Sequence, residues 1–570
     1  MRPPSFSSPE ASSPLPSPLR GECGGEGVPR SSEAWGRIAL DVIGNALLAV
    51  AEEMGVVLIK SSYSSNIKER RDCSAAVFDA RGQLIAQAEH IPMHLGSLSG
   101  IVAEVLKRYP CESLRPGDVF IINDPFTGGG SHLPDITLAS PVFEGGHGPL
   151  VGFVANIAHH ADGGPDRPRT IWEEGLRIPP TRLVEGGRVR DDVMDLLLLN
   201  FRLPEQRRGD LRAQLAANRV GGGRLQALVE RYGRATCLAA MDALLEYSER
   251  RIRAAIRALP AGTYWFADVM DDDGVGQDPI PVCVAVAVQE EDIHLDFAGT
   301  GPQCPGDINV VEGALLATVY YALKAALDPD LPPNGGFHRA IRVTAPPGCL
   351  VNAQPPAAMN WRTQTCQRIA DVIFGALAPV LPDRVLAAGN GANTALEFSG
   401  TDPRSGRPYV YLETLGGGSG AHAHGDGLDG VQVHITNTSN LPTECLELEY
   451  PLLVEEYALV EGSGGPGRRR GGLGMRRTVR VLRHTARVMA HMDRVRVAPW
   501  GLFDGGPGGR GRLVLDPGTP EAKDLPSKAY GLYLRPGQAI LVETPGGGGY
   551  GPPSERDPAR AAEDIAEGKV

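Results

Sequence analysis

The chain has 570 residues, of which 42% are hydrophobic and 22% are charged, a balance typical of a globular protein with more than one core. Its formal net charge of −12 argues against a nucleic-acid-binding protein, because neutralising phosphates requires a basic surface. No uninterrupted apolar stretch reaches the length of a membrane span, and no two of the nine cysteines form a C-x-x-C pair. We therefore expect a cytoplasmic protein that binds neither nucleic acid nor a membrane.

Hydrophobic periodicity predicts helices and strands that alternate along the chain. Helices are predicted at residues 33–57, 98–109, 211–232, 235–259, 314–327 and 366–380. Strands are predicted at residues 73–79, 84–87, 118–122, 136–143, 150–155, 263–270, 282–288, 293–297, 341–351, 409–414, 431–436, 452–460 and 479–482. The 72 glycines and 48 prolines predict many tight turns. The pattern favours the α/β class, with mixed α+β character, and a large loop-rich protein of several layers.

Composition divides the chain into three parts. Residues 1–30 are rich in Pro, Ser, Gly and Glu and are expected to form a disordered tail. Residues 31–555 are expected to form the folded region, with soft internal boundaries near residues 200–260 and near residue 385. Glycine-rich strands follow the second boundary and predict a C-terminal β part. Residues 556–570 form a charged tail.

Histidines are concentrated in one part of the sequence. Of the 13 histidines, those between residues 90 and 160 are His90, His94, His132, His147, His159 and His160. His132 and Asp135 are three residues apart after a glycine run, so both side chains can converge on one ion from a turn. Imidazole nitrogen combined with carboxylate oxygen suits zinc, manganese or ferrous iron. The sequence therefore indicates a candidate metal site.

A second part of this site follows the apolar run at residues 150–155. His159 and His160 are adjacent there, and adjacent residues of an extended segment point in opposite directions, so we expect at most one of them to be a direct ligand. Asp-Pro and glycine runs are also common in ordinary turns, and the H-E-x-x-H motif is absent. Spacing alone leaves a metal site and a set of structural turns about equally open.

Two glycine runs lie further along the chain. Gly462–Gly467 is not a phosphate loop, since no G-x-x-x-x-G-K-[ST] motif occurs in the sequence. The favoured interpretation is a set of tight turns beside the basic run Arg468–Arg470, which we expect to be solvated. Gly416–Gly420 precedes His422, His424 and Asp426. Its composition fits either a functional loop or a mobile surface turn, and the sequence leaves both open.

Six segments, in order over about residues 35 to 555, resemble the hydantoinase B/oxoprolinase family. They are Asn66–Asp79, Asn123–Pro125 with Ser131–Asp135, Ala158–Asp162, Glu174–Pro180, Asp296–Thr300 and Pro545–Tyr550. The resemblance covers almost the whole chain. Residues 31–555 are accordingly expected to be a hydantoinase B-like catalytic region.

The resemblance implies the B-type subunit of an ATP-dependent hydantoinase or 5-oxoprolinase, a hydrolase that opens 5-oxoproline, a hydantoin or a related lactam. In such systems ATP is bound by a separate hydantoinase A-type subunit, and the B-type subunit carries a divalent metal. The family's metal ligands correspond to Asp72, His132, Asp135 and His159. Candidates for moving protons in the reaction are His160, Asp162 and Glu89.

Two other functions fit the same resemblance. The chain is also compatible with a subunit of an ATP-dependent ketone carboxylase, which would use the same metal. A third interpretation is a non-catalytic scaffold that holds an A-type partner. Four intact ligand-type residues argue against the scaffold.

Overall fold

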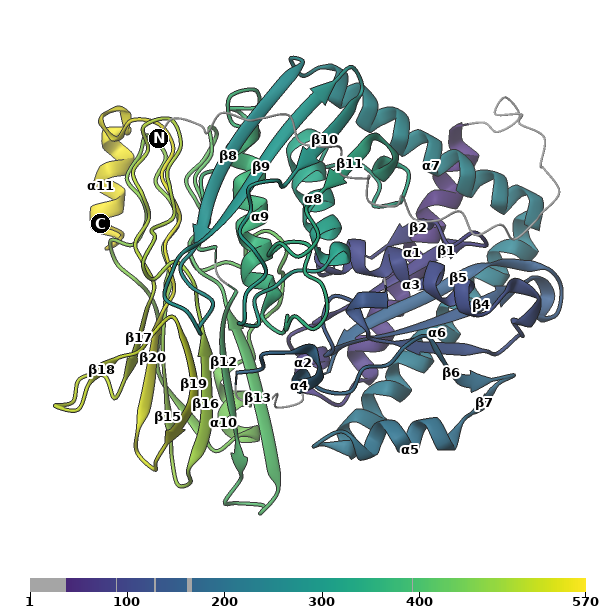
Figure 1. The fold of residues 1–570 in the computed structure, drawn as a ribbon, viewed down its shortest axis with the longest axis horizontal. Helices are drawn as coiled ribbons and strands as arrows, with labels where there is room; N and C mark the ends of the chain where they lie inside the picture. Colours follow the sequence, from purple (N-terminus) through teal and green to yellow (C-terminus); the bar gives the residue numbers. More distant parts are fainter. Residues whose placement is uncertain (1–36, 89, 128–129, 161–166, 392) are drawn as a thin grey trace.

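The computed structural model describes residues 37–570, except residues 89, 128–129, 161–166 and 392. The expected tail at residues 1–30 lies outside the described part. The described chain contains both helices and four β-sheets, which confirms the mixed α/β class. Figure 1 shows the N-terminal sheet on the right, the C-terminal sheets on the left, and helices α8 and α9 between them.

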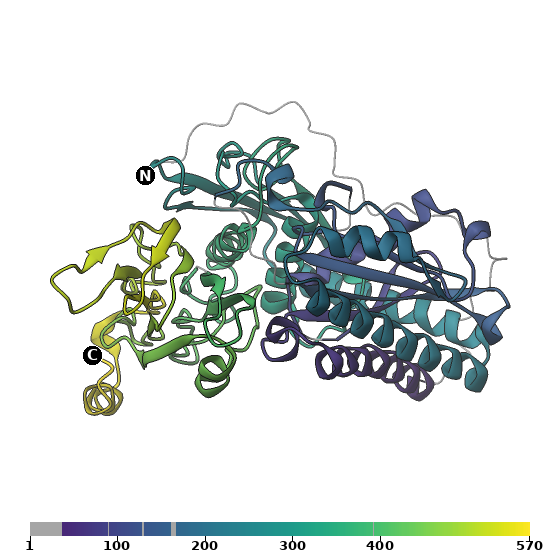
Figure 2. The same ribbon diagram turned by 90° about the horizontal axis from the view of Figure 1, so that it is seen from below.

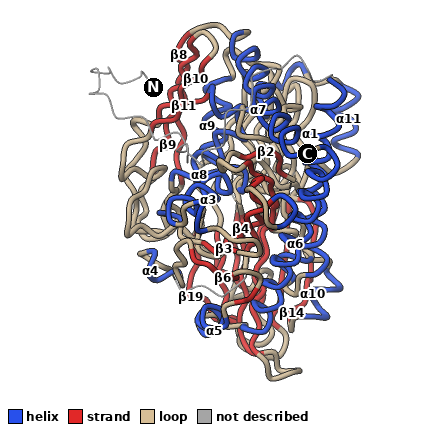
Figure 3. The backbone as a smooth tube through the Cα atoms, turned by 90° about the vertical axis from the view of Figure 1, so that its right-hand side faces the viewer, coloured by secondary structure: helices blue, strands red, loops and turns tan. Residues whose placement is uncertain are grey.

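The N-terminal sheet is antiparallel and has seven strands. Their order is β2 (Leu84–Gln87), β1 (Cys73–Asp79), β5 (Leu150–His159), β4 (Asp135–Phe143), β3 (Val119–Ile122), β6 (Thr181–Glu185) and β7 (Arg188–Val189). Helices α1 (Arg37–Ser61) and α6 (Pro204–Tyr232) cover one face and pack against each other (Figure 2). Helix α3 (His94–Arg108) covers the other face, as Figure 3 shows. Short helices α2 (Ser65–Lys68), α4 (Ile171–Glu174) and α5 (Asp191–Leu199) complete this part.

Helix α1 is the one helix among the described residues whose length and composition would allow it to cross a membrane, over Leu40–Ser61 with a mean hydropathy of 1.8. It packs on α6, α7 and β1. Ile43, Leu47 and Met54 on its inner face are at most 1% exposed. The buried side of a core helix produces the same apolar composition, so this criterion alone is weak evidence for a membrane span.

The middle of the chain packs against the α3 side of the N-terminal sheet. A four-stranded sheet has the order β11 (Ile341–Thr344), β10 (Asp292–Asp296), β9 (Ile280–Gln289) and β8 (Gly262–Met270). Helix α9 (Arg362–Leu377) lies on β8 and β9, and α8 (Glu312–Leu327) lies between α9 and α3. Helix α7 (Arg234–Arg257) runs alongside α1 and α6. One large hydrophobic core joins this sheet to α8 and α9.

The C-terminal β part consists of two sheets that share one hydrophobic core. One sheet has the order β13 (Pro408–Leu415), β12 (Thr394–Thr401), β16 (Ala486–His491) and β19 (Lys528–Leu534). The other has the order β14 (Leu452–Leu459), β15 (Met475–Val481), β20 (Ala539–Glu543), β17 (Arg512–Leu515) and β18 (Lys523–Asp524). The helices of this part are α10 (Thr443–Glu449) and α11 (Pro558–Ala566).

Most predicted elements are present, with ends that differ by a few residues, and the hairpin strands Cys73–Asp79 and Leu84–Gln87 have the predicted bounds. The predicted strand at residues 431–436 is wrong. Val431 makes only an isolated bridge with Gly417, and the backbone turns at His434, whose φ is 50°. The apolar alternation there reflects burial of single side chains in a turn.

The basic run and the charged tail meet in the folded protein. Arg470 is 3% exposed and forms ion pairs with Asp429 and with Asp564 of α11. Arg556 pairs with the same Asp564. The expectation of a solvated basic run is therefore wrong for Arg470, because its guanidinium holds α11 against the glycine-rich loops.

The glycine runs pack against one another as bare backbone. We call residues 416–420, 463–474 and 545–551 the glycine bundle. The Gly547 N–H donates to the Gly472 carbonyl, and the Gly547 carbonyl accepts from the Gly465 N–H, both at 2.8 Å. Gly416, Gly417, Gly418 and Gly420 are buried, so this run is not a mobile surface turn. The absence of side chains lets the segments approach within hydrogen-bonding distance of each other.

We expect the Gly547→Ala substitution to lower the free energy of unfolding by at least about 2 kcal/mol, because a Cβ there would lie 1.8 Å from the Ser419 carbonyl oxygen. Urea denaturation followed by circular dichroism measures the change. Gly223→Ala is the matched control, since a Cβ at this exposed position of α6 meets nothing within 4 Å. The control should leave stability unchanged or raise it by up to about 1 kcal/mol. Equal stability of the two variants would contradict this packing.

Candidate metal centre

Three neighbouring strands bring candidate ligands to one end of the N-terminal sheet. Asp135 begins β4 and His159 ends β5, and the two residues are direct partners across this antiparallel pair. On the other side of β5, the His159 N–H donates to the carbonyl of Asp72, which precedes β1. Directly opposed residues project from the same face of a sheet. Asp72, His159 and Asp135 therefore share the face that is covered by α3.

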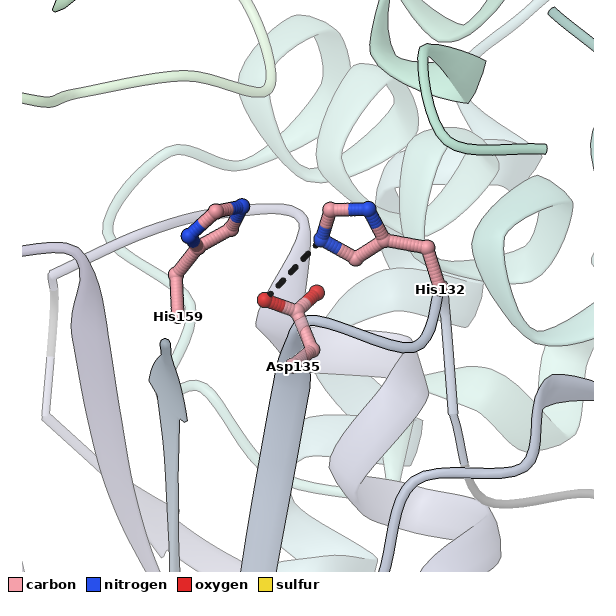
Figure 4. Close-up of side chains that lie close together, drawn as sticks. All are labelled: His132, Asp135 and His159. Carbon is pink, nitrogen blue, oxygen red and sulfur yellow. Dashed lines mark ion pairs between the residues drawn. The ribbon is translucent and has the colours of Figure 1, made fainter. Parts of the chain in front are cut away.

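His132 lies beside Asp72, His159 and Asp135, in the turn before β4, where the Asp135 N–H donates to the His132 carbonyl. Figure 4 shows the side chains of His132, Asp135 and His159 converging. One ligand atom from each of these three residues lies within 4.8 Å of the other two. His132 Nε2 is 3.3 Å from Asp135 Oδ1. Asp72 lines the same cavity beside this triad.

The unpaired atoms of the triad fit a bound cation. His132 Nδ1 lies 3.1 Å from the carbonyl oxygen of Asn360, which can only accept, so Nδ1 carries the proton. Burial and the nearby Arg362 lower the pKa of His132, so its Nε2 presents a lone pair toward Asp135 Oδ1. Both atoms are buried and have no hydrogen-bond partner among the described residues. A divalent cation bound between His132 Nε2 and Asp135 Oδ1 would remove the repulsion between their lone pairs. A set of two imidazoles and one carboxylate suits zinc, manganese or iron.

Two buried arginines balance the carboxylates of the cavity. Arg362 Nη2 is 2.7 Å from Asp135 Oδ2, and Arg70 Nη2 is 3.8 Å from Asp72 Oδ2. Burial alone would raise the pKa of Asp135, but the Arg362 guanidinium and the other groups of the cavity outweigh it and hold that pKa well below its usual range. Burial raises the pKa of Asp72, because its more distant arginine offsets the loss of solvent only in part.

Other side chains hold the ligands in position. Asn66 Nδ2 lies 2.9 Å from His159 Nδ1, and the Asn66 side-chain oxygen accepts from Arg70 at 2.5 Å. Arg70 also donates to the carbonyl of Leu412 in β13. The C-terminal β part therefore takes part in fixing the orientation of His159 through Arg70 and Asn66.

The cavity itself is small, at about 70 Å³, and lies where the N-terminal sheet, α9 and β13 meet. Its lining includes the titratable and charged side chains of Arg70, Asp72, His94, His132, Asp135, His159, Glu174, Arg362 and Glu397, together with Trp361. Its walls come from segments that are far apart in the sequence. Closure of the cavity depends on contact between all three parts of the chain.

The structure separates the adjacent histidines. His159 faces the cavity, whereas His160 points to the opposite face, where its Nε2 lies 3.0 Å from Gln214 Oε1 of α6. Burial and the neighbouring Arg207 lower the pKa of His160 to about 4. This agrees with the expectation that at most one of the pair is a direct ligand. The other two proton-transfer candidates, Glu89 and Asp162, lie outside the described residues.

Among the residues that line the cavity, Arg70, His94, Glu174 and Arg362 are not predicted as site residues from the sequence. His94 Nε2 lies 3.8 Å from Asp135 Oδ1, and its Nδ1 lies 3.0 Å from the Ser74 hydroxyl. The local density of histidines was a signal for His94. His90 and His147, from the same stretch of sequence, do not line the cavity. No local signal marked Arg362, which is distant in sequence.

Comparison with known proteins finds curated relatives of similar length and others that are more than twice as long. It is 39% identical over 546 residues to an uncharacterised protein of Methanocaldococcus jannaschii, and the match covers 94% of each chain. It is 34% identical to a putative B-type subunit of a D-/L-hydantoinase from Pseudomonas sp., covering 94% of this chain and 93% of that one. It is 33% identical to 5-oxoprolinase 1 of Arabidopsis thaliana, of which it spans only 42%.

Two solved structures resemble the fold closely. The ATP-dependent caprolactamase of Pseudomonas jessenii superposes with a TM-score of 0.88 and 31% identity, covering 94% of this chain and 95% of that chain. An acetone carboxylase superposes with a TM-score of 0.84 at 18% identity over 94% of this chain and 78% of that chain, a likeness of fold alone. The family model for hydantoinase B/oxoprolinase matches residues 36–553. The chain belongs to the hydantoinase B/oxoprolinase family.

Proposed function

We propose that this protein is the metal-dependent hydrolytic subunit of an ATP-dependent enzyme that opens a cyclic amide, such as 5-oxoproline, a hydantoin or another lactam. The observation that carries the proposal is the largely buried cluster of His132, Asp135 and His159, in which the facing lone pairs of His132 and Asp135 fit a divalent cation at the cavity. Relatives named as a hydantoinase subunit, a 5-oxoprolinase and a caprolactamase support the substrate class.

We further propose that ATP is bound by a separate A-type subunit and that the assembly works in the cytoplasm. The sequence lacks the G-x-x-x-x-G-K-[ST] phosphate-binding loop. A relative of the same length is named as a subunit, and a 5-oxoprolinase relative is more than twice as long as its matching part. Both observations support a partner, either as a second chain or as a further part of one chain.

In this proposal Asp72, His132, Asp135 and His159 hold a zinc, manganese or iron ion. Such an ion, when bound, lowers the pKa of water enough for it to attack at neutral pH. Arg70 and Arg362 keep the carboxylates Asp72 and Asp135 compensated inside the cavity.

His160 faces α6 instead of the cavity, so we assign it the role of anchoring the end of β5 through Gln214. Asp162 and Glu89 stay candidates for moving protons, on the family resemblance alone.

A ketone carboxylase subunit is the second candidate, since an acetone carboxylase shares the fold. The two activities differ in their products. Incorporation of labelled bicarbonate into a ketone would favour the carboxylase, and ATP-coupled opening of a ring amide would favour the hydrolase. A non-catalytic scaffold would bind no stoichiometric metal, which metal analysis of the purified protein tests.

We expect the Asp135→Ala and His159→Ala variants to lose bound metal and ATP-coupled ring opening together, because each removes one donor of the cluster. Plasma emission spectroscopy measures metal per chain, and amide opening is assayed in the complex with the ATP-binding partner. His147→Ala is the matched control, since His147 is exposed and outside the cavity. Retention of metal and full turnover by both cavity variants would refute the ligand assignment.

We expect Asn66→Ala to weaken Zn²⁺ binding by about 10- to 100-fold while the fold is kept, because Asn66 contacts the His159 ring and does not itself reach the ion. Competition with a zinc-sensitive dye measures the dissociation constant. Ser65→Ala serves as control, since the Ser65 hydroxyl contacts Tyr450 instead of the cluster. Equal zinc affinities of the two variants would show that His159 is not oriented by Asn66.

A further inference from the structure

Glu174 is a carboxyl group that the metal cluster does not use, although it lines the same cavity. It ends the short helix α4, and its Oε1 accepts from the backbone N–H of Asn360 at 2.7 Å and from that of Met359. The carbonyl of the same Asn360 accepts from His132 Nδ1 at 3.1 Å. One residue, Asn360, thus connects Glu174 to His132, which fixes Glu174 relative to the cluster.

The second oxygen of Glu174 is available for chemistry. Oε2 is buried and has no hydrogen-bond partner among the residues that the structure describes, and the same holds for Nε1 of Trp361, another residue of the cavity wall. An unpaired carboxyl oxygen is costly in a buried site unless a ligand or a proton satisfies it. Glu174, which lines the cavity, therefore has one anchored oxygen and one oxygen without a partner among the described residues.

The surroundings of Glu174 favour its protonated form. Burial and the negative charge of Asp307 raise the pKa of Glu174 to about 8, and these effects outweigh the two backbone N–H groups and the guanidinium of Arg362. Asp307 is itself buried, and burial raises its pKa to about 7. Near neutral pH, Glu174 is therefore an acid that can donate a proton.

Ring opening of an ATP-activated amide needs such an acid. Phosphorylation of the amide oxygen by the partner gives a ring carbon that is bonded to phosphate oxygen and doubly bonded to nitrogen. Water adds to this carbon, and the electron pair of the double bond moves to the nitrogen, which takes up a proton. The resulting tetrahedral carbon carries hydroxyl, phosphate and ring nitrogen.

Two bonds of that tetrahedral carbon compete in the next step. If the carbon–oxygen bond to phosphate breaks, the cyclic amide is regenerated and ATP has been hydrolysed without product. If the carbon–nitrogen bond breaks, the ring opens to an acyl phosphate, which a second water hydrolyses to carboxylate and phosphate. Phosphate leaves readily without help, whereas the nitrogen leaves with its electron pair only when it receives a proton.

We propose that Glu174 is the catalytic acid that protonates the departing ring nitrogen and thereby couples ATP hydrolysis to ring opening. The proton moves from the Glu174 carboxyl to the nitrogen as the carbon–nitrogen bond breaks. The hydroxyl on the same carbon becomes a carbonyl, and its proton returns to the Glu174 carboxylate. The number of protons on the enzyme is thus restored in each turnover. This inference rests on the proposed amidohydrolase function.

The test compares Glu174→Gln with Glu173→Gln in the complex with the ATP-binding partner, purified through a tag on this chain. Gln keeps an amide oxygen for the N–H groups of Met359 and Asn360 but cannot donate a carboxyl proton. Glu173, the matched control, is exposed on the same helix and binds Arg169 and Thr170 outside the cavity. The assay counts ADP formed and rings opened, with 5-oxoproline, hydantoin and caprolactam each offered as substrate.

We expect Glu174→Gln to open rings at least about 100-fold more slowly while ADP formation continues, so that ADP per opened ring rises steeply. The Glu173→Gln variant should keep the wild-type ratio. Glu174→Asp, which retains an acid, should recover part of the coupling. An unchanged ratio in Glu174→Gln, or an equal loss of ADP formation and ring opening at normal metal content, would overturn the assignment.

Infrared spectroscopy of the isolated chain gives a readout that needs no turnover. The wild-type minus Glu174→Gln difference spectrum should contain a protonated-carboxyl band that disappears as the pH rises through about 8, and comparison with Glu174→Gln removes the contribution of Asp307. Absence of that band would overturn the inference. If instead the wild-type complex opens none of the offered amides with ATP, the proposed function fails, and the infrared result still decides whether Glu174 carries a proton.

Discussion

Antiparallel pairing of β1, β5 and β4 is the constraint on which the cavity depends. The pairing sets Asp72, His159 and Asp135 side by side at one end of the sheet, on the face toward α3. Side chains alternate along a strand, so a slip of β5 by one residue would turn His159 toward α6 and bring His160 into the cavity. Gln214 on α6 opposes such a slip by bonding His160 on the far face. The register is thus held from both sides of the sheet.

Charge compensation is the second condition for the cavity. Asp135 and Arg362 are almost completely buried, and removing either partner would leave an uncompensated charge inside the protein. Arg362 begins α9 and pairs with Asp135, and Arg70 donates to the Leu412 carbonyl of β13, so the two arginines together connect all three parts of the chain. The same contacts that compensate the buried charges also form part of the cavity wall. The site is therefore complete only when the three parts are in contact.

The sequence predicted the local features well and the long-range features poorly. His132 and Asp135 are close in sequence, so their meeting in a turn could be foreseen from spacing. Asp72 came only from family resemblance, because the β1–β5 pairing that places it beside His159 joins distant segments. Glu174 lies in the family segment Glu174–Pro180. Its proposed role could not be predicted from that segment, because it depends on contact with the distant residues Met359 and Asn360. The strand predicted at residues 431–436 failed because apolar alternation also occurs in buried turns.

The glycine bundle has a consequence for how the protein is made. Its segments hydrogen-bond one another across long sequence separations, and Gly547 lies between Gly465 and Gly472 as their shared partner. The earlier segments therefore leave the ribosome well before residues 545–551, which complete their hydrogen bonds. Until residues 545–551 emerge, the glycine-rich stretches expose backbone N–H and C=O groups, later paired with these residues, to solvent and to neighbouring nascent chains.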